Sequence, residues 1–382
     1  MTSEERKEAR YQRRVKRRAE KKEKKYSSCD DFDQVFSYGN LYRSYKKCRR
    51  GVAWKASVQK YITQAPLLIN QTYDRLQDGT FRSGGFYEFD LNERGKLRHI
   101  KSVTINERVV QRCLCDYALV PVLGRTFVYD NGASMEHKGY TFSIKRLCQH
   151  LREHYRKYGT DGYILLFDFS KFFDNVSHEV IKKIMFREFT DKKIIGLTMH
   201  FVRMFGDVGL GLGSQISQTF ALASANRLDH YVKEVCRIRG YGRYMDDGYL
   251  IHESKEYLQK CLDGIRKMCE ELGITLNEKK TQIVKLTHGF KYLKTRFYLL
   301  DTGKIVRKIH KKSITRQRRK MKKFKALLDA GIMTYEDVYT SWQSWKSYAN
   351  TFSAWHTVQN MAKLYDQLFI EPWLQQGSIV YI

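Results

Sequence analysis

The sequence has 382 residues, of which 42% are hydrophobic, so it is long enough for one large or several small packed units. Lysine and arginine total 70 against 41 acidic residues, a formal net charge of +29. This charge excludes an acidic solvating protein, disfavours an enzyme of small neutral metabolites and indicates a polyanionic partner. The 8 cysteines form no CxxC pair and no apolar run could span a bilayer, so we expect reduced thiols, a cytoplasmic location and no membrane partner.

Residues 1–28 form a basic arm, in which residues 4–25 are rich in good helix formers and nearly free of apolar side chains. A segment without an apolar stripe cannot dock on a core. We therefore expect a solvated helix or a segment that is disordered alone. It either orders on nucleic-acid phosphates or serves only as a solubilising tail.

Residues 29–158 mix helical segments with short β signals. Residues 85–104 predict two strands around a turn at Asn92–Gly95, because alternating residues flank typical turn chemistry. Two amphipathic helices are predicted at residues 106–124 and 143–158.

Residues 159–300 alternate between predicted strands and helices. The continuous apolar run at 163–167 is typical of a strand buried on both faces. Residues 243–252 predict two short strands with residues 246–248 at the tip of the hairpin. Helices are predicted at 214–237 and 254–272, and a further β-rich segment at 283–299.

Residues 301–382 begin with a second basic cluster at 304–325 and continue as helical, aromatic-rich sequence. The cluster either follows a nucleic-acid backbone or is a solvated helix face. We expect the tryptophans of this segment to pack between helices rather than to stack on bases.

Three carboxylates occupy two places that the predicted sheet can bring together. Asp168 directly follows the buried strand, and Asp246 and Asp247 lie at the predicted hairpin tip, where the normal alternation of side chains breaks. Such a cluster is costly unless divalent cations occupy it, and oxygen ligands suit Mg²⁺. A surface hairpin without chemistry is the alternative. A separation well over about 10 Å, or a basic side chain filling the pocket, would contradict metal binding.

Five further segments follow one another along the chain: FDFSKFFD (167–174), GLGSQISQ (211–218), YMDD (244–247), LGITLNEKKT (272–281) and FKYLKTRF (290–297). They occur in the order of reverse-transcriptase palm motifs, and the sequence from about Asp78 to Leu299 resembles bacterial and phage reverse transcriptases. The resemblance implies an α+β right-hand polymerase: fingers at 29–158 with part of 184–208, an antiparallel-sheet palm at 159–300 and a helical basic thumb at 301–382.

The activity implied by this resemblance is RNA-directed DNA polymerisation, in which two Mg²⁺ ions, or Mn²⁺ in their place, help to add dNTPs to a primer on an RNA template. Asp168, Asp246 and Asp247 match the metal-binding aspartates, and Lys280 matches a lysine near the leaving pyrophosphate. Phe173 matches the bulky residue that excludes a 2′-hydroxyl, although a core phenylalanine is the alternative.

The resemblance also implies contacts for the nucleotide, the template and the primer. Lys96 and Arg98 match the fingers hairpin that binds the triphosphate; alone, either residue reads as a solvated surface residue. Lys294 stands where relatives often carry glycine. The further matched positions are Phe169, Gln215 and Gln218 for the nucleotide, Leu212, Gly213 and Ser217 for the template and fidelity, and Tyr292 and Leu293 for the primer grip.

The segment 211–218 departs from the commoner bacterial pattern, because Leu212 replaces a glutamine and Gln218 replaces a proline. Its LGxxxSQ form resembles reverse transcriptases of diversity-generating retroelements and of defence-associated bacterial groups. This implies a bacterial or prophage-encoded enzyme in antiphage defence, with a dedicated noncoding RNA, a DNA product and an accessory protein as candidate partners, or a mutagenic retroelement enzyme.

Two further classes of function stay open: an RNA-templated RNA polymerase and a non-catalytic RNA-binding scaffold. Phe173 and YMDD speak against the first, and the intact acidic residues against the second. Because the sequence ends soon after the thumb-like segment, we expect no RNase H, integrase or HNH-type unit.

Overall fold

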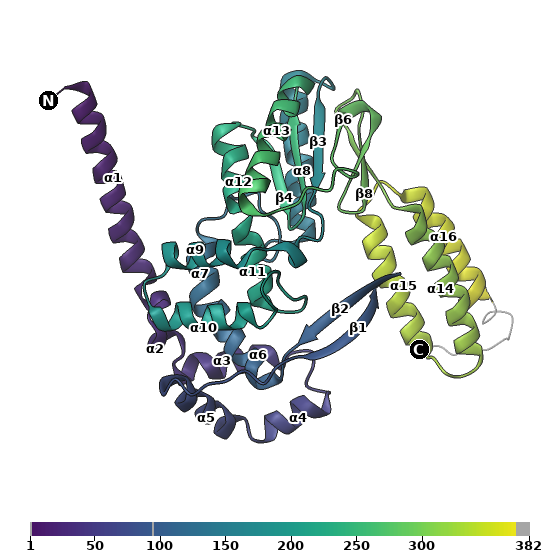
Figure 1. The fold of residues 1–382 in the computed structure, drawn as a ribbon. Coiled ribbons are helices and arrows are strands. Elements are labelled where there is room, and N and C mark those ends of the chain that lie inside the picture. Colours follow the sequence, from purple (N-terminus) through teal and green to yellow (C-terminus); the bar gives the residue numbers. More distant parts are fainter. Residues whose placement is uncertain (1, 94, 372–382) are drawn as a thin grey trace.

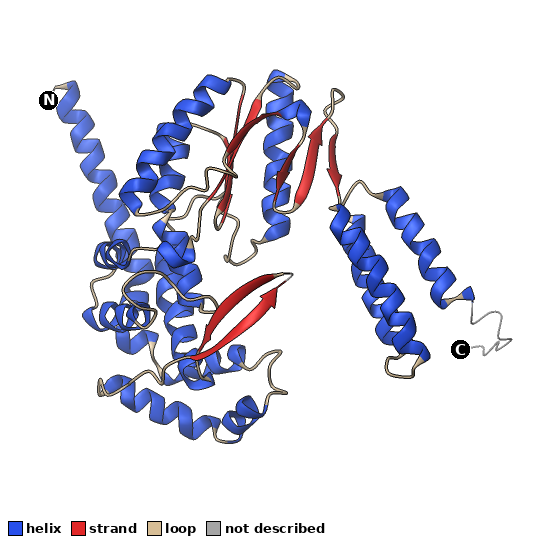
Figure 2. Ribbon diagram, turned by 45° about the vertical axis from the view of Figure 1, so that its right-hand side comes forward, coloured by secondary structure: helices blue, strands red, loops and turns tan. Residues whose placement is uncertain are grey.

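The structure, a computed structural model, describes residues 2–93 and 95–371. Its main body has a helical part and a part built on a four-stranded sheet, and two helical extensions leave this body (Figures 1 and 2). One extension is helix α1 (Ser3–Tyr26), and the other is a bundle of helices near the C-terminal end. Within the described ranges, no helix is both long enough and apolar enough to cross a membrane.

Helix α1 projects away from the body in both views (Figures 1 and 2). Nearly all of its described side chains are exposed, as its sequence without an apolar stripe predicts. Of the two expectations for the basic arm, the structure therefore shows the solvated helix.

The helical part carries the predicted hairpin, in which strands β1 and β2 pair antiparallel with Glu93 opposite Lys96. The helix predicted at 106–124 is present, and Thr104 caps its start by accepting a hydrogen bond from the Glu107 N–H. The elements are α2 (Phe32–Val35), α3 (Tyr38–Cys48), α4 (Ala56–Thr63), α5 (Ala65–Gln77), β1 (Tyr87–Glu93), β2 (Lys96–Ser102), α6 (Ile105–Leu114), the π-helical turn Cys115–Leu119, α7 (Val120–Gly124), α9 (His178–Glu188) and α10 (Lys192–Arg203).

The four-stranded sheet has the order β4-β5-β3-β6, and all neighbouring strands are antiparallel. Leu165 and Phe167 of β3 pack into one core with α13, whereas Ile164 and Leu166 pack into a second core with α8. The prediction of a strand buried on both faces is thus confirmed. The elements are α8 (Tyr140–Tyr158), β3 (Tyr163–Asp168), α11 (Gln215–Ser224), α12 (Asn226–His230), β4 (Gly240–Tyr244), β5 (Asp247–His252), α13 (Lys255–Leu272) and β6 (Gln282–Lys285).

Three details differ from the sequence-based expectations. The helix predicted at 214–237 is interrupted at Ala225, which leaves the helical region between α11 and α12. The hairpin turn consists of Met245 and Asp246, so Asp247 lies in strand β5 and not at the tip. The β-rich segment 283–299 divides between two sheets, because β6 joins the main sheet while β7 (Phe290–Tyr292) and β8 (Thr295–Leu299) pair with β9 (Ile305–Lys308).

The C-terminal bundle has a core of its own, formed along its three helices. Trp342 and Trp345 are buried there with ring centroids 5.7 Å apart, which confirms helix packing for these two residues. Trp355, in contrast, is 67% exposed. The helices are α14 (Lys311–Asp329), α15 (Tyr335–Asn350) and α16 (Trp355–Phe369).

Candidate active site

The three aspartates are brought together by strand pairing. Asp168 ends β3 and lies directly opposite Asp247, the first residue of β5. The Cβ atoms of such antiparallel partners are about 4.5–5.5 Å apart. Asp246 precedes Asp247 in the turn, and its carbonyl accepts a hydrogen bond from the Phe169 N–H at 3.2 Å. Residues far apart along the chain thus meet at one end of the sheet.

The carboxylates share surroundings that oppose their negative charge. Burial, followed by the charges of Asp246 and Asp168, raises the pKa of Asp247 to about 7. Burial also raises the pKa of Asp246, and Asp168 adds to the shift while Lys280 and Arg98 oppose it. Clustered carboxylates with raised pKa values are a donor set that a divalent cation would stabilise in its ionised form.

Lys280 supplies a positive charge at the rim of this cluster. Its Nζ donates to Asp168 Oδ2 at 2.7 Å, which raises the pKa of Lys280. Asn277 fixes the same segment, because its backbone N–H donates to the Asp168 carbonyl at 2.8 Å and its side chain to Asp168 Oδ1 at 3.3 Å. The Lys280 side chain is 57% exposed, so it lies over the cluster rather than within the core.

In this conformation the aspartates do not close on one point. Among residues 2–93 and 95–371, no three carboxylate, imidazole or thiol side chains are arranged to hold a metal ion. Strand pairing places Asp168 and Asp247 side by side with Asp246 next to them, and metal binding by the three carboxylates stays a prediction. Lys280 contacts Asp168 from the rim with more than half of its side chain exposed, so this basic side chain does not fill the pocket between the aspartates.

The β1–β2 hairpin brings a second positive charge toward the aspartates. Arg98 is exposed on β2, and its charge lowers the pKa of Asp246, against the larger effects of burial. Lys96 begins β2, but its side chain lies outside the described residues. A Cβ built on Gly213 would lie 3.6 Å from Ile100 Cγ2, so β2 passes close to the loop before α11.

The loop before α11 and the first turn of that helix line a cavity of about 430 Å³ with residues of the helical part. Gly213 has a φ of +110°, a conformation that favours glycine. Gln215 donates to Asp116 at 3.1 Å, and Gln218 accepts from the Ser134 hydroxyl at 3.2 Å. Leu212 is partly buried beside them. Sequence reasoning missed the basic residues of this cavity, Lys47, Arg108 and Arg112, because they read as ordinary cations on helix surfaces.

Three of the residues predicted to contact substrates have buried side chains. The ring of Phe169 is 2% exposed and packs against Phe167 and Phe172, so only its backbone faces the aspartates. Ser217 is fully buried in the core face of α11. Tyr292 is 3% exposed, and its ring packs edge-on to Tyr249 at 5.0 Å.

Phe173 and the turn after Tyr292 remain accessible. Phe173 is partly buried, and its carbonyl accepts a hydrogen bond from the Leu210 N–H at 2.7 Å, which places it beside the loop that leads to Gly213. Leu293 and Lys294 form the β7–β8 turn with φ values of +45° and +64°. Both residues therefore adopt the left-handed conformation without being glycine.

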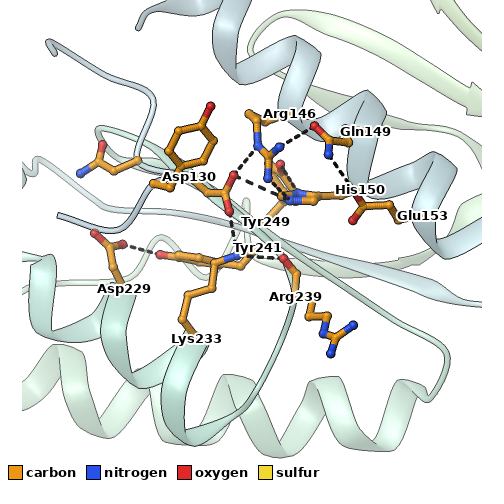
Figure 3. Close-up of polar contacts among 12 residues, drawn as sticks. Asp130, Arg146, Gln149, His150, Glu153, Asp229, Lys233, Arg239, Tyr241 and Tyr249 are labelled. Carbon is orange, nitrogen blue, oxygen red and sulfur yellow. Dashed lines mark hydrogen bonds and ion pairs between the residues drawn. The ribbon is translucent and has the colours of Figure 1, made fainter. Parts of the chain in front are cut away.

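A buried polar network behind the hairpin was also missed. Figure 3 shows Asp130 between Arg146 and Lys233, at 2.6 and 2.8 Å, with His150 linked to Tyr249 at 2.9 Å. A nearby pair joins Arg243 of β4 to Asp229 of α12, and both side chains are fully buried. The sequence signal that could have indicated this pair is the single arginine directly before YMDD, within a predicted strand.

Comparisons with solved structures find similarity to three telomerase structures. They are apo telomerase from Candida tropicalis truncated from the C-terminal domain (15% identity, TM-score 0.45, 58% of this chain and 55% of that chain), telomerase from Candida albicans in complex with a TWJ fragment of telomeric RNA (12%, 0.45, 58% and 45%) and apo telomerase from Candida tropicalis (14%, 0.45, 64% and 53%). The chain thus spans about half the length of these structures. A comparison with curated proteins finds no significant match.

A match to a protein family covers more than half of the chain. The profile described as reverse transcriptase (RNA-dependent DNA polymerase) matches residues 90–297, which is more than half of the chain and includes all three aspartates. The matched region also holds the antiparallel sheet and the helices that cover it. The chain therefore belongs to the reverse transcriptase family, with the right-hand polymerase fold.

Proposed function

We propose that this protein is an RNA-directed DNA polymerase that works by a two-metal mechanism, in which Asp168, Asp246 and Asp247 bind two Mg²⁺ ions, with Mn²⁺ able to replace them. The observation that carries the proposal is the pairing of Asp168 with Asp247 beside Asp246, in surroundings that raise carboxylate pKa values. When bound, the ions would activate the primer 3′-hydroxyl and stabilise the leaving pyrophosphate.

The remaining site residues bind and orient the substrates. Arg98 and Lys96 bind the triphosphate, and Phe173 selects deoxynucleotides by blocking the space of a 2′-hydroxyl. Lys280 leaves Asp168 when metal binds and then protonates the leaving pyrophosphate. Leu212, Gly213, Gln215 and Gln218 contact the nascent base pair and template, while the turn at Leu293 contacts the primer.

We propose the following division of the chain into domains. The basic arm is 1–28, the fingers are 29–158 with part of 184–208, the palm is 159–300 and the thumb is 301–382. The separate core of the α14–α16 bundle supports a thumb that folds as its own unit. The exposed basic surfaces of α1 and α14 follow the nucleic-acid backbone.

For the biological role, we favour antiphage defence in a bacterial cytoplasm, from a chromosomal or prophage gene, with a dedicated noncoding RNA as template and an accessory protein as a candidate partner. The LGxxxSQ segment and the net charge of +29 support this role. The same segment favours, as the second candidate, the mutagenic reverse transcriptase of a diversity-generating retroelement.

The test is to sequence the nucleic acid that copurifies with the protein and the DNA that it synthesises from dNTPs and Mg²⁺. Copies of one structured RNA support defence, whereas copies of a repeat within a protein-coding gene support diversification. Synthesis only from ribonucleotides would overturn the proposed substrate. Synthesis that persists in Asp246→Asn and Asp247→Asn would overturn the proposed metal site.

A further inference from the structure

Arg243 is the largest fully buried side chain among the described residues. It lies in β4, two positions before the turn that carries Asp246. Its Nε donates to Asp229 Oδ1 at 2.7 Å and its NH2 to Asp229 Oδ2 at 2.6 Å, so the guanidinium forms a two-point contact with a carboxylate that is also fully buried. This geometry is specific to arginine.

The rest of the Arg243 guanidinium binds backbone carbonyls. NH1 donates to the Met245 carbonyl at 2.8 Å, and NH2 donates to the Leu222 carbonyl at 3.2 Å. Met245 is the first residue of the catalytic turn, and Leu222 lies in α11. One side chain therefore connects the turn, the helix that begins with Gln215, and helix α12.

Asp229 keeps this guanidinium charged and oriented. Burial opposes the charge, but the attraction of Asp229 outweighs it and raises the pKa of Arg243 above its ordinary value. The Tyr241 hydroxyl also donates to Asp229 Oδ1, so the carboxylate itself is held from two sides. Because a buried ion pair adds little net stability compared with apolar residues of the same size, the arrangement is better explained by the geometry that it imposes.

The Met245 peptide needs such support. Met245 has a φ of +54°, which is unfavourable for a residue with a side chain. The following residue, Asp246, is bound through its carbonyl to the Phe169 N–H, next to Asp168. A change in the Met245 peptide would therefore alter where both carboxylates of the turn lie relative to Asp168.

We infer that Arg243 is a positioning residue of the polymerase: held by Asp229, it fixes the Met245 carbonyl so that Asp246 and Asp247 can bind divalent cations together with Asp168. The inference rests on the proposed function of the three aspartates. Arg243 touches neither substrate nor metal and acts only through the turn. Its contact with Leu222 also links the metal site to the helix that contributes to nucleotide binding.

The test compares Arg243→Lys with Arg125→Lys. Lysine keeps the charge for Asp229, but a single ammonium cannot also reach the carbonyls of Met245 and Leu222. Arg125 is a matched control, because it binds the Glu188 carboxylate at 2.6 Å and the Val122 carbonyl at 3.0 Å in another part of the body. Mn²⁺ binding is measured by electron paramagnetic resonance, and primer extension is titrated with Mg²⁺ and with dNTP.

We expect Arg243→Lys to weaken Mn²⁺ binding by about 10- to 100-fold, the usual effect of losing a residue that orients metal ligands. The Mg²⁺ concentration for half-maximal extension should rise in parallel, and kcat should fall more than the KM for dNTP changes. Arg125→Lys should bind Mn²⁺ like the wild type.

The outcomes distinguish a failure of the proposed metal site from a failure of the positioning role of Arg243. Failure of the wild type to bind Mn²⁺, or unchanged Mn²⁺ binding in Asp247→Asn, overturns the proposed metal site itself. Wild-type Mn²⁺ affinity in Arg243→Lys overturns only the positioning role. If circular dichroism shows that Arg243→Lys is unfolded, Asp229→Asn replaces it: the amide keeps the shape of the carboxylate, and the same loss of Mn²⁺ affinity is expected.

Discussion

Two tight hairpins of this protein reverse the chain in the same way but are stabilised differently. The β4–β5 turn uses Met245 and Asp246, the β7–β8 turn uses Leu293 and Lys294, and both place residues with side chains in the left-handed region. The first is fixed from the core by Arg243. For the second, no side chain in residues 2–93 and 95–371 is seen to hydrogen-bond the two turn peptides, and the Leu293 side chain packs against the neighbouring core.

The difference shows what each turn must position. A turn that presents carboxylates has to hold them against mutual repulsion, which strand pairing alone does not resist. A turn that presents only its backbone and an aliphatic side chain tolerates small displacements. A buried ion pair therefore supports the first turn, whereas no ion pair within the described part of the chain involves the second.

The largest effect is expected from the carboxylates of the first turn. Asp246→Asn and Asp247→Asn should each lower the rate of DNA synthesis by about 1000-fold or more, because losing a metal removes several kcal/mol of transition-state stabilisation. Primer extension at saturating substrate measures this. Asp263→Asn, an exposed carboxylate on α13, is the control and should retain wild-type activity. Full activity in either variant would show that the first turn does not present carboxylates needed for DNA synthesis, and the contrast between the two turns would fail.

A smaller loss is expected at Lys280. Lys280→Met should lower kcat by about 100-fold, in line with the loss of a general acid. The Mg²⁺ requirement should not increase, because Asp168 is then no longer paired with Lys280. Lys279→Met changes an exposed neighbour and serves as the control. A higher Mg²⁺ requirement in Lys280→Met would instead indicate that the lysine helps to assemble the metal site.

The pH dependence of stability should also distinguish the two turns. The pKa of Asp247 is raised to about 7 in the folded state, so the metal-free protein should lose stability as the pH rises from about 4 to about 7. Asp247→Asn should remove this loss and be more stable than the wild type at pH 8 by on the order of 2 kcal/mol. Urea unfolding with a chelator, at pH 5 and pH 8, measures the difference. Equal stability at both pH values in the wild type would contradict the raised pKa.

The smallest effect concerns the second turn. Lys294→Gly should stabilise the protein by about 1 kcal/mol, because glycine adopts a φ of +64° without the steric penalty that lysine has. Lys291→Gly, in the extended strand β7, should be destabilising and controls for the general effect of glycine. Both are measured by urea unfolding. A destabilised Lys294→Gly would show that side-chain contacts support this turn after all.

Local patterns predicted the elements that carry the site but not their tertiary surroundings. The apolar run before Asp168 and the turn residues around Asp246 were enough to predict the buried strand and the hairpin. Sequence pattern did not show that Phe169 and Tyr292 face a core, because burial of an aromatic ring depends on which distant helix or strand packs against it.

The same limit applies to the Arg243–Asp229 pair and to the division of residues 283–299 between two sheets. Asp229 and Arg243 lie on different elements, and only the packing of α12 against the sheet side that holds Tyr241 brings them together. In the second case, the chain turns between β6 and β7 at Gly289, whose φ is +71°. A propensity for extended structure does not specify which partner strand is chosen.

The Arg243 guanidinium binds the Asp229 carboxylate and two backbone carbonyls, and the Tyr241 hydroxyl donates to the same carboxylate. A change in one of these residues would therefore leave its partners without their hydrogen bonds. Among homologous sequences, an acidic residue at position 229, tyrosine at 241 and arginine at 243 should be inherited as a set, and lineages that lose one should have replaced the others. Covariation of these positions in an alignment would be the evolutionary trace of how the catalytic turn is held.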